Sequence, residues 1–351
     1  MSDGSVLLIG SVNLPNVHEV MEACSRELGS CVHRLTDGEA GGWCNIPAEA
    51  IGRSKGFEKL PRPPGRHSDI PTPSRLMDGV SAADLVFEPT GYVEIATSSY
   101  AIFKELRAAG KIAPEVRFQQ SLPTPLAACA TGLLTSDILA VLPHFTRHVL
   151  SEVAQIVAAI PPEDLAIQWD LAAEVYAVLE KQEPVVAGLF SVDDLADQVA
   201  ELCNSVSGDV ECGIHMCYGQ ADAAEAAREA GAEAAPAHVP ADCALMVGLA
   251  NALFARLSRP LTWLHIPVPI RRDDPAYCAP LKDLRLPDAT QLYLGVVHLK
   301  DGLEGAERRI AAAKTAVGRF GVATECGLRM IPSERIPEIL DVHRQAAALA
   351  S

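Results

Sequence analysis

Basic residues are scarce in this sequence, and their scarcity limits the functions that it can support. The 351 residues include 29 Lys and Arg against 45 Asp and Glu, which gives a formal net charge of −16 at pH 7. A protein that wraps a phosphate backbone needs clustered cations. The charge balance therefore argues against a nucleic-acid-binding protein.

Long apolar runs and export signals are lacking as well. No stretch approaches the roughly 18 consecutive apolar residues that a membrane-spanning helix needs. The first ten residues, MSDGSVLLIG, have no basic region like that of a secretory signal peptide. The 10 cysteines do not suggest a disulfide scaffold in a chain of this length. These features predict a cytoplasmic protein without membrane association, whose cysteines are mostly thiols.

The glycine motifs of nucleotide-binding proteins are missing too. No Gly-x-Gly-x-x-Gly opens a helix after the first apolar run, and no P-loop occurs. Short apolar runs typical of buried strands instead alternate with segments of helical periodicity. The predicted strands lie at 6–10, 31–35, 91–96, 116–120, 165–169, 210–214, 261–266, 291–299 and within 321–330. The predicted helices lie at 16–28, 98–109, 137–160, 192–203, 221–230, 241–257, 303–317 and 334–349.

This alternation predicts an α/β protein in which crossover helices connect the strands of a parallel sheet. A count of about eight strands favours a single (β/α)8 barrel of the TIM type over residues 1–351. Residues 53–75 interrupt the pattern with a Pro-rich and Arg-rich insertion that is expected to be irregular. The insertion is either a solvated loop or a lid whose Arg62 or Arg66 meets an anionic substrate.

One stretch carries most of the chemistry that the sequence suggests. In GDVECGIHMCYGQ (208–220), an apolar strand ends in His215 and Cys217, whose side chains share a face because strand side chains alternate. Far downstream, the strand in GVATECGLRM (321–330) runs out into Cys326. Strand ends converge on one face of a barrel, so the imidazole and the two thiols either bind one metal ion, for which zinc is suited, or are structural side chains.

Further polar and aromatic side chains follow the predicted strands on the same face. Asp37 and Glu39 either bind polar groups of a substrate or cap a loop. Trp43 and Trp169 either stack on a flat substrate or pack in the barrel wall. Ser121 begins a turn that either faces the substrate or is structural.

Four motifs in this chain resemble the catalytic barrel of cobalamin-independent methionine synthase, in the superfamily that this enzyme shares with uroporphyrinogen decarboxylase. They are Ile9-Gly10-Ser11, Ile167-Gln168-Trp169-Asp170, His215-Met216-Cys217-Tyr218 and Cys326-Gly327-Leu328-Arg329, and they occur in family order over nearly the whole chain. The resemblance implies that His215, Cys217 and Cys326 bind a zinc ion that activates a thiol substrate. A methyl-folate donor is one option that it leaves open.

The chain departs from the family pattern at several positions. It is too short for the family's second, N-terminal barrel. His265 stands near the position of the family's zinc-binding Glu, either as a fourth ligand or as a core residue beside the site. Asp170 is followed by Leu171-Ala172 where the family has Glu-Pro, and His298 lies near the family's Asp-x-His-Ser. Asp170 and His298 are the candidate proton donors.

The interpretation that follows is a zinc-dependent methyl or alkyl transferase that activates a thiol and has diverged from cobalamin-independent methionine synthase. The partner is a small-molecule substrate, with a homo-oligomer left open. Two alternatives remain at this point. One is a zinc-dependent lyase or hydrolase on the same barrel, because an open zinc position also polarises oxygen substrates or water. The other is a metal-free decarboxylase-like or binding protein.

Overall fold

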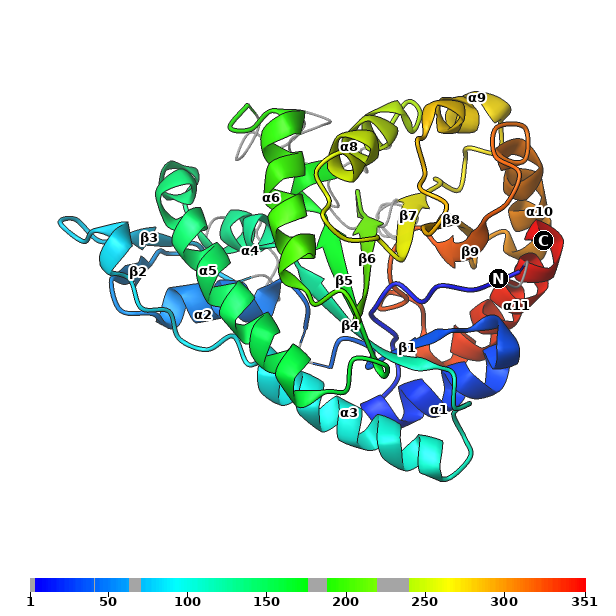
Figure 1. Cartoon of the computed structure of the whole chain (residues 1–351), viewed down its shortest axis with the longest axis horizontal. Helices are drawn as coiled ribbons and strands as arrows, with labels where there is room; N and C mark the ends of the chain where they lie inside the picture. Colours follow the sequence, from blue (N-terminus) through cyan, green and yellow to red (C-terminus); the bar gives the residue numbers. More distant parts are fainter. Residues whose placement is uncertain (1–3, 41, 63–70, 176–187, 220–239) are drawn as a thin grey trace.

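A curved sheet of seven parallel strands forms the centre of the molecule (Figure 1). The computed structural model describes residues 4–40, 42–62, 71–175, 188–219 and 240–351. In sheet order the strands are β1 (Arg34–Thr36), β4 (Arg117–Pro123), β5 (Leu165–Leu171), β6 (Glu211–Met216), β7 (Trp263–Pro267), β8 (Gln291–Val297) and β9 (Gly321–Thr324). Neighbouring strands run in one direction, so their C-terminal ends meet at one face. The predicted α/β class is confirmed.

The N-terminal segment lies between the two edge strands of this sheet. Val6 makes isolated parallel bridges to Val32, beside β1, and to Val322 in β9. Single bridges do not amount to a strand, so the predicted strand at 6–10 is wrong in detail. The sheet is a curled, barrel-like seven-stranded sheet and not the closed ring of eight strands that the sequence predicted.

Side chains of β4 on the inner face of the sheet hydrogen-bond to the N-terminal segment, which explains why this segment does not pair as a further strand. The carbonyl of Leu8 accepts a hydrogen bond from Gln119 Nε2 at 2.9 Å, and that of Ile9 accepts one from Ser121 Oγ at 3.0 Å. A backbone carbonyl that already has a side-chain partner does not need a strand partner. The segment is therefore held in the barrel by side chains of β4 as well as by its two bridges.

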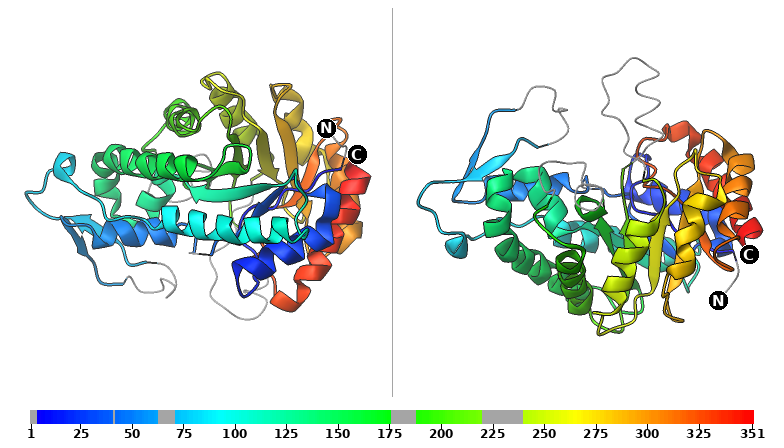
Figure 2. Two further views of the ribbon diagram at one scale, coloured as in Figure 1. Left: turned by 60° about the horizontal axis from the view of Figure 1, so that its bottom comes forward. Right: turned by 90° about the horizontal axis from the view of Figure 1, so that it is seen from above.

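Helices surround the outer side of the sheet (Figures 1 and 2). The longer ones are α1 (Val17–Leu28), α3 (Tyr92–Ala108), α5 (Thr135–Ala159), α6 (Val192–Ser205), α8 (Ala244–Phe254), α10 (Gly302–Ala313) and α11 (Ile336–Ala350). Shorter helices are α2 (Asn45–Arg53), α4 (Pro125–Gly132) and α9 (Pro275–Cys278). Each of these longer helices matches a predicted helix with shifted ends, and α3 begins six residues before the helix predicted at 98–109. The helix predicted at 221–230 lies outside the described residues.

The strand predicted at 91–96 is wrong, because these residues begin α3. The buried positions Tyr92, Ala96, Ser99, Tyr100 and Phe103 recur at helical spacing. The apolar run at 91–96 is thus the first turn of a longer amphipathic pattern. A short apolar run does not distinguish the two periods, whereas the full length of α3 does.

The insertion predicted at 53–75 contains regular structure. β2 (Phe57–Lys59) pairs antiparallel with β3 (Ser74–Leu76), and both strands lie at the margin of the molecule in Figures 1 and 2. The Leu76 amide donates to Asp137 in the first turn of α5 at 2.8 Å, which anchors this pair to the barrel. Arg66 lies outside the described residues, and the expectation of a wholly irregular segment was wrong.

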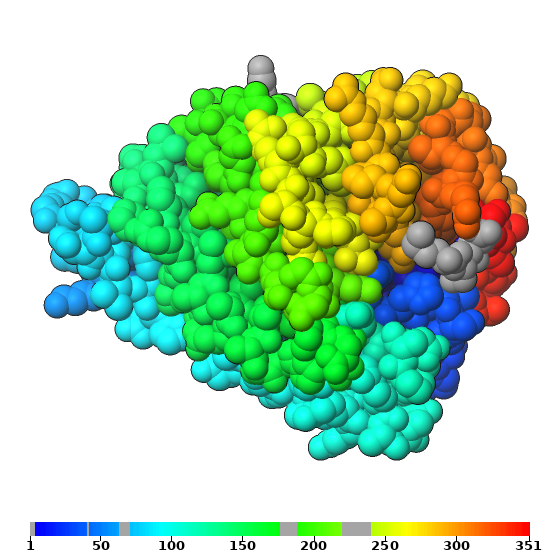
Figure 3. Space-filling model, viewed as in Figure 1, coloured from blue at the N-terminus to red at the C-terminus, as the bar shows by residue number. Residues whose placement is uncertain are grey.

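Apolar side chains fill both faces of the sheet. Most of the core lies between strands and helices, and a smaller cluster from alternate strand positions fills the inside of the curve: Leu7, Ile9, Ala166, Trp263, Tyr293 and Ala323. The described chain begins beside the end of α11 (Figures 1 and 3), where a Cβ atom built on Gly4 would lie 2.6 Å from the Ala347 carbonyl oxygen. Among the helices that the structure describes, none is long and apolar enough to cross a membrane.

Candidate metal centre

The strand register places three polar side chains at one level of the barrel mouth. Asp170 of β5 is paired with His215 of β6, and His215 is paired with His265 of β7. Residues in register on parallel strands point to the same face. Cys217 follows two residues after His215, and its amide donates to the Leu171 carbonyl at 3.1 Å, which fixes the chain beyond the end of β6.

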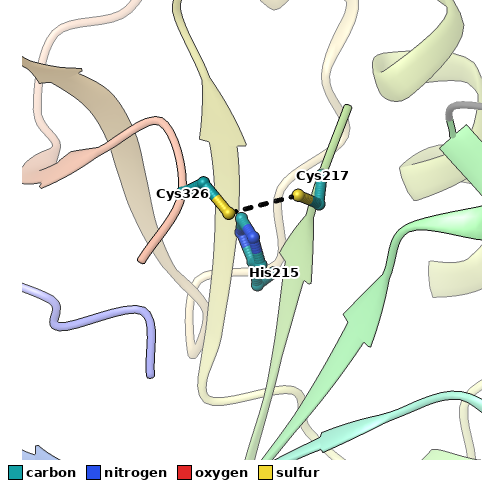
Figure 4. A group of neighbouring side chains, drawn as sticks. All are labelled: His215, Cys217 and Cys326. Carbon is teal, nitrogen blue, oxygen red and sulfur yellow. Dashed lines mark hydrogen bonds between the residues drawn. The ribbon is translucent and has the colours of Figure 1, made fainter. Parts of the chain in front are cut away.

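His215, Cys217 and Cys326 converge at this mouth, as predicted (Figure 4). One ligand atom from each residue lies within 4.8 Å of the others, and the two sulfurs are 3.5 Å apart. That separation is too long for a disulfide. It is close to the roughly 3.8 Å expected between two thiolates of a tetrahedral zinc site with bonds of about 2.3 Å. The donor set therefore suits zinc in chemistry and in spacing.

The protonation states of the three side chains suit metal binding as well. Burial, reinforced by the neighbouring His265, holds the pKa of His215 well below its usual range, so its ring is neutral. The hydrogen bond with Cys217 and then burial raise the pKa of Cys326 well above that of a free thiol. Without a cation this thiol stays protonated, and a bound metal would favour its thiolate.

His265 contacts His215 directly. Their Nδ1 atoms are 2.8 Å apart, and burial lowers the pKa of His265 to about 3, so one neutral ring donates to the other. Within the described residues, His215 Nε2 is buried without a hydrogen-bond partner. If His215 donates through Nδ1, its Nε2 lone pair is available as a ligand. The three-residue ligand group does not include His265.

A cavity of about 330 Å³ adjoins these ligands and is here called the acidic cavity. Its walls include His215, Cys217 and Cys326 together with Glu39 and Asp170. Burial, and then the repulsion between the two carboxylates, raises the pKa of Glu39 well above its usual range. Burial likewise raises the pKa of Asp170. The cavity thus holds carboxyl groups that keep protons at a pH where exposed ones lose them.

Hydrogen bonds fix the orientation of Asp170. Trp43 Nε1 donates to its Oδ2 at 2.9 Å, and Gln168 Nε2 donates to its Oδ1 at 2.8 Å. Glu39 and Trp43 have φ angles of 56° and 47°, a left-handed backbone that is uncommon for residues with side chains. Such strain is typical of functional loops, because the surrounding structure must hold it.

The remaining predicted residues have other surroundings. Asp37 accepts hydrogen bonds from the Glu39 amide at 2.8 Å and from Ser99 Oγ at 3.1 Å, as a loop cap does. Ser121 is buried against Ile9, and Trp169 is fully buried. Among the described residues, none of Asp37, Ser121 and Trp169 lines the acidic cavity. His298 is buried with Nε2 2.9 Å from the Val268 carbonyl, and it lines a neighbouring cavity.

Sequence reasoning missed several residues of the acidic cavity as contributors, among them Ser11, Asn45, Arg329 and Met330. Ser11 and Arg329 belong to the motifs Ile9-Gly10-Ser11 and Cys326-Gly327-Leu328-Arg329, so the signal was present in the sequence. Asn45 and Met330 carried no such signal. Arg329 acts on Glu39 as a nearby positive charge that partly offsets the rise of its pKa.

Comparisons with known proteins give a likeness of fold. No family model and no curated protein matches this chain. A B12-independent methionine synthase from Shewanella sp. W3-18-1, solved in complex with selenomethionine, superposes with a TM-score of 0.57 at 13% identity, covering 99% of this chain and 98% of that one. A methyltransferase from Methanosarcina mazei superposes with a TM-score of 0.52 at 11% identity, covering 97% and 94%. At such identities these likenesses establish the fold alone.

Proposed function

We propose that this protein is a zinc-dependent transferase that moves a methyl or alkyl group onto the sulfur of a thiol substrate. The observation that carries the proposal is the convergence of His215, Cys217 and Cys326 beside the acidic cavity. The fold shared with a methionine synthase and a methyltransferase supports it. The methionine synthase chain is matched over 98% of its length.

His215, Cys217 and Cys326 would hold the zinc ion, and His265 would orient His215 through the Nδ1 contact of 2.8 Å. Zinc with two thiolates and an imidazole carries little net positive charge and favours the ionised form of a substrate thiol near neutral pH. All three side chains line the acidic cavity, so a zinc ion that they held would be accessible to a substrate sulfur in that cavity.

The walls of the acidic cavity would bind and orient the acceptor. Glu39 and Asp170 can accept hydrogen bonds from an amino group, and Arg329 suits a carboxylate, so a thiol that also carries amino-acid groups fits this cavity. The methionine synthase of similar fold was solved with selenomethionine, which carries the same groups. Trp43 would close one side of the cavity and keep Asp170 in place through its hydrogen bond.

In the transfer, the acceptor sulfur forms a bond to the methyl carbon while the bond from that carbon to the donor breaks. The donor leaves with the electron pair and requires a proton. Asp170 is held in its protonated form by burial and lines the same cavity as the metal ligands. His298, the other proposed proton donor, lines the neighbouring cavity, which shares Cys326.

The test is elemental analysis of the purified protein. We expect about one zinc per chain in the native protein and loss of zinc in Cys217→Ser and Cys326→Ser, with the fold retained by circular dichroism. Cys31→Ser is the matched control, because Cys31 is a free thiol that is not part of the ligand group, and it should keep its zinc. A native protein without stoichiometric metal would refute the proposal.

A zinc-dependent lyase or hydrolase is the second candidate. The protonated Glu39 and Asp170 favour it to some extent, because paired carboxyl groups also serve acid–base chemistry on an oxygen substrate. The two candidates differ in their need for an acceptor. Thioether product that appears only when a thiol is supplied supports the transferase, and equal turnover without thiol supports the lyase or hydrolase.

A further inference from the structure

A second cavity adjoins the metal centre, and the proposed acceptor does not occupy it. It has a volume of about 340 Å³ and shares Cys326, Gly327 and Met330 with the acidic cavity. Much of its lining is apolar, and the apolar side chains are those of Val297, Leu299, Leu328, Met330, Ile331 and Pro332. It is here called the apolar cavity.

The charged groups of the apolar cavity differ from those of the acidic one. Lys300 and Arg335 line it, whereas the acidic cavity has Glu39 and Asp170 together with Arg329. Arg335 is paired with Glu338 at 2.7 Å but keeps 45% of its side chain exposed, so it remains accessible to a ligand. Glu325 also lines the cavity and accepts a hydrogen bond from Tyr218 at 3.3 Å. Two cations beside one apolar cavity are notable in a chain of net charge −16.

Exposed apolar surface marks the boundary between the two cavities. Met330 is 64% exposed although it is a large apolar residue, and it contributes to both cavities. Apolar side chains that line an open cavity favour a ligand that removes them from water. An apolar ligand body over Met330, with an anionic group near Arg335, would satisfy both features.

We propose that the apolar cavity binds the second reactant of the transfer, a small molecule with an apolar body and an anionic group. This inference rests on the proposed function, because it assigns a separate cavity to each of two reactants on either side of a shared Cys326. A transfer between two bound molecules requires both to reach one point together. The cations Lys300 and Arg335 would hold the anionic group of this reactant on the apolar side of Cys326.

The test uses 2-naphthoate, an anionic aromatic probe, and its neutral analogue 2-naphthamide, with binding measured by calorimetry on the full chain. We expect one naphthoate per chain and weaker binding of the amide. Arg335→Ala should weaken naphthoate binding by about threefold to fivefold. Arg344→Ala is the matched control, because Arg344 pairs with Asp341 on α11 in the same way but does not line the cavity, and it should leave binding unchanged.

A second variant tests whether the ligand occupies the volume of the apolar cavity. Leu299→Trp places an indole in the apolar cavity and should weaken naphthoate binding by about tenfold or more, whereas Leu245→Trp, at an exposed position of α8, should not. Absence of binding, equal binding of the amide, equal effects of the two arginine variants, or binding that survives Leu299→Trp would each overturn the inference.

Elemental analysis of the same samples separates this inference from the proposed function. Naphthoate binding in a protein without zinc would support the apolar cavity as a binding site and reject the zinc-dependent transferase. One zinc per chain without naphthoate binding would reject the cavity inference alone. Binding that is weakened by Arg335→Ala in protein with one zinc per chain supports both.

Discussion

At the residue scale, Glu174 is a buried carboxyl group that the proposed chemistry does not use. It follows β5 and is only 2% exposed. Burial raises its pKa to about 7 from an ordinary value of 4.5, even though a hydrogen bond from Thr124 acts in the opposite direction. The folded protein therefore binds a proton here between about pH 4.5 and 7 that the unfolded chain releases.

We expect Glu174→Gln to remove a pH dependence of stability. Since the folded pKa is raised, the folded state is favoured fully below pH 4.5, and this advantage is lost as pH rises through 7. Relative to the variant, the native protein should lose up to about 3 kcal/mol of unfolding free energy over this range. Urea unfolding at pH 5, 6, 7 and 8 measures the difference.

The matched control for this prediction is Glu201→Gln, because Glu201 is exposed on α6. Its difference from the native protein should stay flat across the same pH range. A difference between Glu174→Gln and the native protein that is equally flat would show that Glu174 is ionised in the folded state.

The positions of individual site residues were the feature that could be predicted best from the sequence. An imidazole and a thiol two positions apart on a strand must share a face, so His215 and Cys217 follow from strand geometry alone. The environment of His265 did not follow. Only the register between β6 and β7 sets its ring beside His215, and no local pattern determines which strands are neighbours.

At the scale of elements, the contact between β6 and β7 depends on one glycine. A Cβ atom at Gly213 would lie 1.9 Å from the ring of Trp263, which is fully buried inside the curve of the sheet. The missing side chain on β6 thus makes room for the largest side chain of β7. This packing lies below the metal ligands and supports the strand that carries His215.

We expect Gly213→Ala to destabilise the protein by about 2–3 kcal/mol, because overpacking displaces Trp263 or its strand. Gly208→Ala is the control, since no atom lies within 4 Å of a Cβ built there, and it should change stability by less than about 1 kcal/mol. Urea unfolding at constant pH compares the two variants. Equal stability of both would mean that the indole can move away without loss.

Element prediction succeeded where a pattern was long. The helix predicted at 137–160 is α5 (Thr135–Ala159), and the strand predicted at 165–169 is β5 (Leu165–Leu171). The prediction failed at 91–96, because a short apolar run fits the period of a helix as well as that of a strand. It also failed for the pair β2 and β3, since proline content indicates irregular structure but does not exclude a short antiparallel pair.

At the scale of the whole molecule, a zinc ion would connect distant parts of the chain. Cys217 follows β6, Cys326 follows β9, and 109 residues separate them. Because the unfolded chain does not hold these sulfurs together, binding energy at the site adds to the stability of the folded state.

We expect a chelator to lower the melting temperature of the native protein by about 3 °C or more, and added zinc to restore it. Cys326→Ser should melt at one temperature under all three conditions, while Cys31→Ser should respond as the native protein does. Differential scanning calorimetry gives the comparison. If the native protein melts identically with chelator and with zinc, the three side chains are only lining residues of the cavity.

The sequence by itself determined the α/β class, the direction in which strand side chains point, and the identity of the three proposed ligands, because all three depend on local periodicity and residue type. The tertiary structure alone decided that the sheet has seven strands with the N-terminal segment between its edges, and that Cys326 lies 3.5 Å from Cys217. It also decided that the three proposed ligands adjoin two cavities with different linings. These facts depend on contacts between residues far apart in the chain, which no local pattern specifies.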